Sequence, residues 1–492
     1  MTPVALLVCI AVVFLVLQQA SPRLAAHPLV FLGFNLAFIA LIMPVRAIVW
    51  LAAYIALNYI LAAAARRFPA APAAGFILPA ALVFAVIKKY DFIPLPALYV
   101  HIPEIIGLSY IVFRGLIVIF EARDTRKLPG IVSYLNYCLS LFTFLSGPIQ
   151  RYRAFSEDMT RRVDFRLDEK EGAAALTRFM NGVVKIVYLS LLAQNAQNFF
   201  MQAGQKSVTF ARRESITVVL HGPLEVLGPM APSFGFGLAA LCYLFFLYFN
   251  FSGYTDMMIG LGRLLGFRLP ENFDRPFTAS SFLDFWKRWH ASLSLWFRDY
   301  CFTPVLKRMV KAGIKDPAIA TLPAYFISFG LLGLWHGRTW PFILCGLMFA
   351  TGSSANHFYR SILNRRVARA ALDKLDGSSL YKAFAAAVTF FYISLAITGL
   401  WLSEDEFYKS WHSFSISQAA VSFSLIIAVL SCILYLVRTL WHKERVQALM
   451  VRPVHDFFFR ETSFLIAAKI FLVVVWYFVF SANLPDFVYE QF

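Results

Sequence analysis

Charged residues are scarce in this chain. Only 15% of its 492 residues are Asp, Glu, Lys or Arg, whereas a soluble globular protein carries about 25%. Hydrophobic residues make up 59% of the chain, and the mean hydropathy is +0.65, so the apolar side chains exceed what one soluble core could bury. The composition excludes a soluble enzyme, a disordered tail and a fibrous chain, and it predicts an integral membrane protein.

Paired cysteines and several short enzyme motifs are also missing. The six cysteines form no CxxC pair, and we expect neither disulfides nor a metal site. The chain has no GxSxG, no GxxxxGK(S/T) and no HExxH sequence, so serine hydrolysis, NTP-driven transport and zinc proteolysis lack support. The net charge of +17 is expected in cytoplasmic loops beside anionic lipid and does not imply nucleic-acid binding.

Long apolar runs are what the sequence does contain. A membrane-spanning helix needs about 20 mostly apolar residues, and the charge of the intervening loops favours ten spans with both termini outside. We place these spans near residues 4–20, 28–43, 47–65, 73–88, 103–120, 174–200, 233–260, 383–402, 418–437 and 463–481. The run from Val4 to Leu17 has no preceding Lys or Arg and no A-x-A site, so we expect a retained first helix rather than a cleaved signal.

Two further apolar stretches, 131–149 and 320–350, have Lys and Arg on both flanks. Since such flanks stay in the cytoplasm, we expect both stretches to be re-entrant. The Gly147-Pro148 pair supports this for the first, because a helix interior tolerates it poorly unless other protein surrounds the broken backbone. The prediction is an all-α integral membrane protein of about ten transmembrane helices plus re-entrant segments. It forms one domain, with N-terminal helices in 1–100, a central part in 101–350 and C-terminal helices in 351–492.

His336 is the first candidate functional residue. It stands in Gly333-Leu334-Trp335-His336-Gly337 within an apolar stretch, where an ionisable group is costly enough to suggest a function. Burial favours the neutral imidazole, which could accept a proton from a substrate. A structural histidine bonded to a backbone carbonyl is the alternative, and the residues alone leave both open.

His290 is the second candidate. It lies in the segment 284–300, which holds three Trp, three cationic side chains and two Asp within seventeen residues. This composition suits an amphipathic segment at the membrane interface, with Trp at headgroup depth and Lys and Arg reaching water. A purely structural segment is thus one interpretation, and a histidine that orients a substrate or His336 is the other.

At these residues the chain resembles the membrane-bound O-acyltransferase family, in particular the bacterial branch that modifies cell-envelope polymers. The similarity covers about residues 100–350, and its blocks occur in the family's order. They are Ser146 to Phe155, Asn250 to Gly260, Glu271 to Phe273, Phe285 to Tyr300 and Gly333 to Gly337.

The resemblance implies a ring of membrane helices around a thin, funnel-like centre. It makes His336 the family histidine and places His290 at the second family position, so both are predicted to be catalytic. The block at 146–155 is most similar to D-alanyl transferases of teichoic acid, whereas 250–256 resembles the alginate and peptidoglycan O-acetylation proteins. The acetylation branch usually has a glycine-containing run after Tyr300, and this chain has none there.

The predicted reaction is transfer of an acyl group, acetyl in the first instance, from a cytoplasmic thioester donor. The acceptor would be a cell-envelope polysaccharide or a periplasmic partner, and the protein would lie in the bacterial cytoplasmic membrane, in contact with lipid. The donor would be acetyl-CoA or an acyl-phosphopantetheine carrier protein, with no bound cofactor. D-alanyl transfer to teichoic acid or a similar polymer is one alternative. A polysaccharide or proton-coupled transporter, with His336 and Asp256 as relay groups, is another.

Four residues are candidates for binding a substrate or donor: Trp335, Arg288, Arg298 and Asp256. The cationic side chains between residues 287 and 308 could dock an acidic donor, or they could anchor lipid headgroups. Asp256 is a costly intramembrane carboxylate unless it is paired. It could therefore partner an Arg structurally, or it could contribute to the site.

Overall fold

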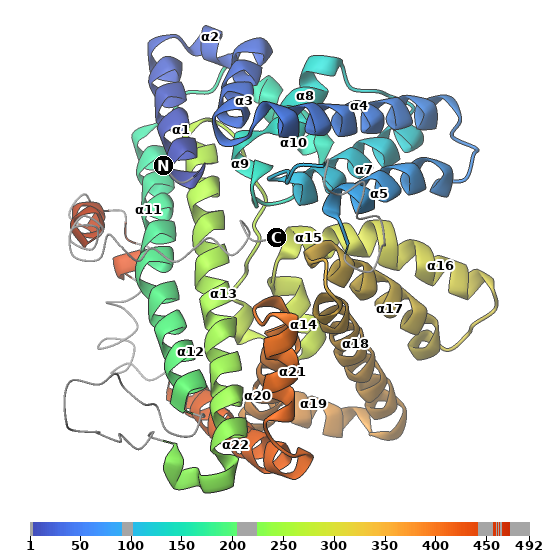
Figure 1. Ribbon diagram of the computed structural model, residues 1–492, viewed down its shortest axis with the longest axis vertical. Coiled ribbons are helices and arrows are strands. Elements are labelled where there is room, and N and C mark those ends of the chain that lie inside the picture. The colour runs from blue at the N-terminus through green and yellow to red at the C-terminus, as the bar shows by residue number, and fades with distance from the viewer. Residues whose placement is uncertain are drawn as a thin grey trace.

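A computed structural model of the chain (Figure 1) describes residues 3–90, 102–203, 224–440, 456–458, 460, 462 and 465–472. Over these residues the regular structure is helical, without strands. Seven helical segments are long and apolar enough to cross a membrane: Pro3–Ala20, Val45–Arg67, Glu169–Ala203, Val226–Leu264, Pro317–His336, Ser379–Leu400 and Ile416–Leu440. The predicted all-α membrane fold is confirmed.

Six of the ten predicted spans coincide with these long segments. They contain α1 (Pro3–Ala20), α4 (Val45–Arg67), α11 (Glu169–Val184) with α12 (Leu191–Ala203), α13 (Ala231–Leu264), α20 (Ser379–Ala396) and α22 (Ile416–Leu440). Two more correspond to shorter apolar helices, α3 (Pro28–Ile42) and α5 (Ala74–Lys88). The predicted span at 463–481 lies largely outside the described residues.

The prediction of a span at 103–120 needs correction. The helix there is α7 (Leu108–Thr125), which begins and ends about five residues later and carries four charged side chains, Arg114, Glu121, Arg123 and Asp124. It is not among the seven segments that qualify by length and composition. The shift arises because Gly107, in a left-handed conformation with φ 77°, precedes the first turn and so sets where the helix starts.

The stretch at 320–350 forms a helical hairpin. It consists of α17 (Pro317–His336) and α18 (Trp340–Arg366), which pack against each other around the turn at 337–339. The chain thus reverses direction at this turn, but α18 continues sixteen residues past the predicted end. Of the two helices, α17 is the one that is long and apolar enough to be a span, and re-entry into the membrane stays a prediction.

The stretch at 131–149 is broken, as its Gly-Pro pair predicts. It forms α8 (Ile131–Leu139) and α9 (Leu141–Phe144), and residues 145–150 leave the helix. Arg114 of α7 is 2% exposed and donates to the carbonyl oxygens of Tyr137 at 3.2 Å, Cys138 at 2.6 Å and Thr143. These carbonyls lie where the helix ends leave acceptors without intrahelical partners, so one buried guanidinium closes the break.

The remaining helices are ten residues long or shorter. Their bounds are α2 (Pro22–Ala26), α10 (Tyr152–Arg161), η1 (Lys185–Ser190), η2 (Glu225–Met230), η3 (Pro276–Thr278), α14 (Phe282–Arg288), α15 (Ala291–Phe297), η4 (Arg298–Phe302), α16 (Thr303–Lys311), α19 (Arg369–Gly377), η5 (Ile397–Leu400) and α21 (Glu404–His412). In Figure 1, α1 to α10 gather at one end of the molecule, and α14 to α22 occupy the other.

The pair formed by α11–η1–α12 and α13 runs along the length of the molecule and joins these two ends (Figure 1). The two helices approach closely where Gly182 faces Gly253. A Cβ atom on Gly182 would lie 2.4 Å from the carbonyl oxygen of Gly253, and one on Gly253 would lie 2.7 Å from that of Gly182. Small residues allow membrane helices to pack backbone against backbone, and here only glycine fits.

We predict that Gly182→Ala destabilises the protein. The added methyl would meet backbone atoms, which cannot move as a flexible side chain can, and such overpacking costs about 1–3 kcal/mol. Gly172→Ala on the same helix is the matched control, since its Cβ would lie 3.6 Å from its nearest neighbour, Leu167. The Tm of each purified variant in detergent should fall for Gly182→Ala and stay level or rise for Gly172→Ala. Equal Tm values would contradict the proposed close crossing.

Candidate active site

His290 occupies the break between α14 and α15. Ser281 begins α14 by accepting the backbone N–H of Asp284 at 3.2 Å, and the helix ends at Arg288. His290 then takes a left-handed conformation, φ 43° and ψ 51°, directly before α15. A residue with a side chain adopts this region at a cost of about 1–3 kcal/mol, so its surroundings must hold it there. The result is an imidazole that is 2% exposed.

Asn272 is the main polar neighbour of His290. Its Oδ1 lies 3.2 Å from Nδ1 of His290, and it accepts the hydroxyl of Ser292 at 2.6 Å and the backbone N–H of Ser292 at 3.3 Å. Its backbone carbonyl accepts the N–H of Ala291 at 2.8 Å. The Asn272 side chain is completely buried. The segment around residue 272 therefore fixes the turn that contains the histidine.

His336 is the last residue of α17 and is also buried. The residue before it, Trp335, donates its indole N–H to the carbonyl of Ser109 at 2.8 Å and packs its ring 5.0 Å from that of Phe113. Trp335 thus anchors the end of α17 to α7, and this anchoring contact fixes where the neighbouring imidazole emerges.

Helix α7 links the two histidine segments. The ring of Phe113 lies 4.5 Å from Trp296 of α15 and 5.0 Å from Trp335 of α17. His290 lies outside the seven candidate spans, and its burial, together with the nearby positive charge that His336 can carry, lowers its pKa well below the usual value. Burial therefore favours the neutral form of His290, and α7 contacts both segments that carry the histidines.

A cavity of about 400 Å³ lies between α14, α15, α17 and α18. From α17, the side chains of Tyr325, Ser328, Phe329 and Leu332 line it. Residues three and four apart share a helix face, so His336 follows Leu332 on that same face. On the opposite wall, α15 contributes its first residue, Ala291, which follows His290. Each histidine is thus close along the chain to a residue that lines the cavity, although neither histidine is part of the lining.

The cavity is mainly apolar, with two cations. Lys287 and Arg298 line it and are exposed, and no acidic side chain belongs to its lining. Arg298 also pairs with its neighbour Asp299 at 2.8 Å. In the described ranges, no group of three or more His, Cys, Asp or Glu side chains is arranged to hold a metal ion. The site is suited to an apolar or neutral group attached to an anion.

The other candidate binding residues have protein partners. Arg288 donates to Asp284 at 3.0 Å and lies 3.7 Å from Asp274. Among the predicted binding residues, only Arg298 faces the cavity. Trp335 and Arg288 lie beside the histidine segments, where they support the local fold.

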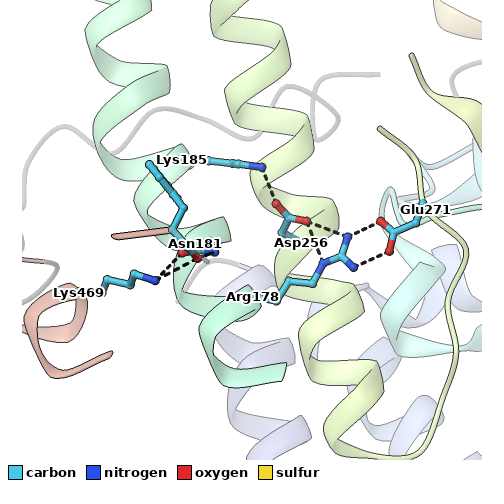
Figure 2. A network of polar contacts seen from close by, with 7 residues as sticks. Arg178, Asn181, Lys185, Asp256, Glu271 and Lys469 are labelled. Carbon is cyan, nitrogen blue, oxygen red and sulfur yellow. Dashed lines mark hydrogen bonds and ion pairs between the residues drawn. The ribbon is translucent and has the colours of Figure 1, made fainter. Parts of the chain in front are cut away.

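Asp256 belongs to an ion-pair network between α11 and α13 (Figure 2). Its two carboxylate oxygens accept from Arg178 at 3.0 Å and from Lys185 at 2.6 Å. The same guanidinium binds both oxygens of Glu271, one of them at 2.5 Å, and Arg263 lies 3.5 Å from that carboxylate. Of the two interpretations of Asp256, this geometry favours the structural pairing.

Sequence reasoning did not single out Asn272 or Ser292. Both lie in blocks that carry the family resemblance, but a neutral amide and a hydroxyl have no charge or hydropathy signal of their own. Twenty residues separate them along the chain, so only the fold reveals that they meet under His290.

Comparisons with known proteins identify the family of the chain. The model of the membrane-bound O-acyltransferase family matches residues 104–399, which is more than half of the chain and includes both histidines. The chain therefore belongs to this family. It is a multi-pass membrane acyltransferase, and the transporter alternative has no support from these matches.

The similar curated proteins fall into two groups. The teichoic acid D-alanyltransferase of Bacillus subtilis (strain 168) is 30% identical over 302 residues, which cover 58% of this chain and 69% of that protein. A probable alginate O-acetylase AlgI of Azotobacter vinelandii is 31% identical over 269 residues, which cover 54% of this chain and 47% of that protein. A probable alginate O-acetylase AlgI of Pseudomonas syringae pv. tomato is 30% identical over 253 residues, which cover 51% of this chain and 42% of that protein. The chain thus spans about half the length of these alginate proteins.

We predict that Asp256→Ala destabilises the protein without weakening donor binding. The substitution leaves Arg178 and Lys185, whose side chains are both 20% exposed, without their shared carboxylate. Removing one partner of a buried pair costs about 3–5 kcal/mol, and the slight exposure here places the loss near the lower value. The Tm should fall, while the KM for the acyl donor should stay within two-fold of the wild-type value, a tolerance of about 0.4 kcal/mol.

Asp405→Ala is the control, because its pair with Lys409 is 76% and 72% exposed and should contribute little. A stable Asp256→Ala variant with a raised donor KM would instead show that Asp256 binds substrate.

Proposed function

We propose that this chain transfers acetyl from a cytoplasmic thioester to hydroxyl groups of a cell-envelope polysaccharide, or to a periplasmic partner, in the bacterial cytoplasmic membrane. The observation that carries the proposal is an apolar cavity lined by Lys287 and Arg298, formed by the helix segments that lead to the buried His336 and His290. A neutral acyl group would enter the cavity, and the cations would attract the anionic phosphates of its carrier.

His336 is the proposed catalytic base. It removes the proton of the acceptor hydroxyl as that oxygen attacks the thioester carbonyl. The carbon–sulfur bond then breaks, and the thiolate takes up a proton, so that an ester and a free thiol are formed. A positioned base contributes about 10²- to 10⁴-fold to the rate, and alignment of donor and acceptor in one site adds to this. In this scheme His290 orients the acceptor hydroxyl.

The donor is proposed to be acetyl-CoA or an acyl-phosphopantetheine carrier protein. Both present a thioester at the end of a long, flexible arm with a phosphate at its base. A cavity of about 400 Å³ can receive the end of such an arm, while Lys287 and Arg298 remain near the phosphate.

D-alanyl transfer to teichoic acid or a similar polymer is the second candidate. It is favoured by the match to the D-alanyltransferase of Bacillus subtilis, which covers 69% of that protein. The cavity favours acetyl, because its described lining holds no carboxylate to pair with the ammonium of a D-alanyl group.

We predict that His336→Ala abolishes ester formation on the envelope polymer while the protein still inserts and folds. Acyl groups released by mild alkali should be identified by mass spectrometry in cells with the wild-type chain, no chain or the variant. Acetate lost in the last two would support acetyl transfer, and D-alanine lost instead would move the assignment to the second candidate. His412→Ala, at an exposed position on α21, is the control and should leave the esters unchanged. Unchanged esters in cells without the chain would refute the proposal for that polymer.

We also predict that the double variant Lys287→Gln and Arg298→Gln raises the donor KM. Two exposed charge contacts to an anion contribute about 0.2–1 kcal/mol each, which corresponds to an increase of a few-fold in total. The wild-type KM should rise with ionic strength, and the variant should lose most of that dependence. The control is Arg369→Gln, since that side chain is 88% exposed on α19, away from the cavity lining. An unchanged donor KM in the double variant would rule out a role of these cations in donor binding.

A further inference from the structure

We propose that Asn272 is a positioning residue that holds His290 in the tautomer with the proton on Nδ1, so that Nε2 presents its lone pair to a non-reacting hydroxyl of the acceptor. The inference rests on the proposed function, in which the two histidines serve acyl transfer. It adds to that function a specific residue, a specific proton position and a direction for each hydrogen bond.

The first step is the identity of the atom that faces His290. The backbone N–H of Ser292 points to the same side-chain atom of Asn272, at 3.3 Å. A backbone N–H can only donate, so this atom must be an acceptor. The amide of Asn272 therefore places its oxygen, not its nitrogen, toward His290. This settles the orientation of the amide from its neighbours.

The second step is the direction of the bonds around Ser292. The backbone N–H of Ile149 donates to Oγ of Ser292 at 3.0 Å. The hydroxyl of Ser292 keeps one proton, which it donates to Oδ1 of Asn272 at 2.6 Å. The Asn272 oxygen thus only accepts. At 3.2 Å from the same oxygen, Nδ1 of His290 must be the donor, and it carries the ring proton.

The third step concerns the other ring nitrogen. A neutral imidazole has one N–H and one lone pair, and burial and the neighbouring His336 keep the pKa of His290 well below its usual value. With Nδ1 protonated, Nε2 is the acceptor. It is buried, and it has no hydrogen-bond partner in the parts of the chain that the structure describes. A second, non-reacting hydroxyl of the acceptor sugar would supply the missing donor, while the reacting hydroxyl keeps its proton for His336. Nε2 is then the point where the acceptor is held.

The fourth step is the support of Asn272 itself. The preceding residue, Glu271, is bound through both carboxylate oxygens by Arg178 of α11, which also holds Asp256 of α13 (Figure 2). The backbone carbonyl of Asn272 accepts from Ala291. The ion-pair network thus ties the 271–272 segment to the two longest helices, which fixes the amide under the imidazole. Such second-layer hydrogen bonds commonly set the tautomer and orientation of a functional histidine.

The test reads the tautomer directly. The full-length chain is labelled with ¹⁵N in its histidine rings and studied by NMR in detergent, and His290→Asn identifies the signals of residue 290. We expect the wild-type His290 to carry its proton on Nδ1. In Asn272→Leu, which keeps the volume but has no acceptor, the proton should move to Nε2. In Asn272→Asp, which keeps an acceptor oxygen, it should stay on Nδ1.

We expect kcat to change in the same variants as the tautomer. Asn272→Leu should lower kcat by about ten-fold or more, since a misplaced acceptor loses part of the contribution of a positioned base, while the donor KM changes little. Asn272→Asp should recover much of that loss. Asn58→Leu is the matched control, because Asn58 is a buried amide on α4 that donates to Tyr54 within its own helix. It should change neither the tautomer nor kcat beyond its effect on stability.

Two results would overturn the inference: a wild-type His290 with its proton on Nε2, or an unchanged tautomer in Asn272→Leu. The wild-type spectrum alone decides the first, so the test survives if a variant fails to fold. Ester formation that persists in His336→Ala would refute the proposed function instead. The two failures are therefore distinguishable.

Discussion

The cost of burying polar groups among apolar helices is the constraint on which this structure depends. An unpartnered polar atom in such surroundings loses its bonds to water without replacement. Hydrogen bonds and ion pairs satisfy buried polar groups at three places. These are the guanidinium of Arg114, the carboxylate of Asp256 with Arg178 and Lys185, and the amide of Asn272. Each lies where a helix breaks, begins or closely meets another. Irregular backbone can therefore lie only where such contacts supply the hydrogen bonds that a helix would otherwise provide.

Irregular backbone, in turn, makes the candidate site possible. The irregular segment after α9 brings the N–H of Ile149 to Ser292, and the left-handed turn between α14 and α15 brings His290 to Asn272. A continuous helix would satisfy its own backbone groups and would offer none of them to a neighbouring segment. Both candidate histidines therefore lie at helix ends, His336 at the end of α17 and His290 directly before α15.

Much of the fold could be predicted from the sequence because lipid exposure leaves long apolar runs, and cytoplasmic loops leave Lys and Arg. The prediction fails at α7, where Arg114 and three further charges sit in a helix that is largely buried by protein instead of lipid. His336 could be proposed as a site residue because an ionisable group in an apolar segment is conspicuous, and His290 because it stands in a block that resembles the family. Their catalytic roles stay predictions. Asn272 could not be proposed in this way, since its role comes from the meeting of segments far apart in the chain, which no local pattern encodes.

In the proposed reaction, the side chains that bind the donor differ from those that take part in the chemical step. Lys287 and Arg298 are exposed and can exchange contacts with an anion at little cost, so they suit a donor that must arrive and leave. The histidines are buried and held by fixed dipoles, so they suit a step in which charge develops only briefly. An apolar cavity between the two lets a neutral acyl group pass from one to the other while the charged carrier remains outside. In the proposed reaction, selection of the acyl group is then a matter of charge inside the cavity, and this is why a lining without carboxylates favours acetyl over D-alanyl.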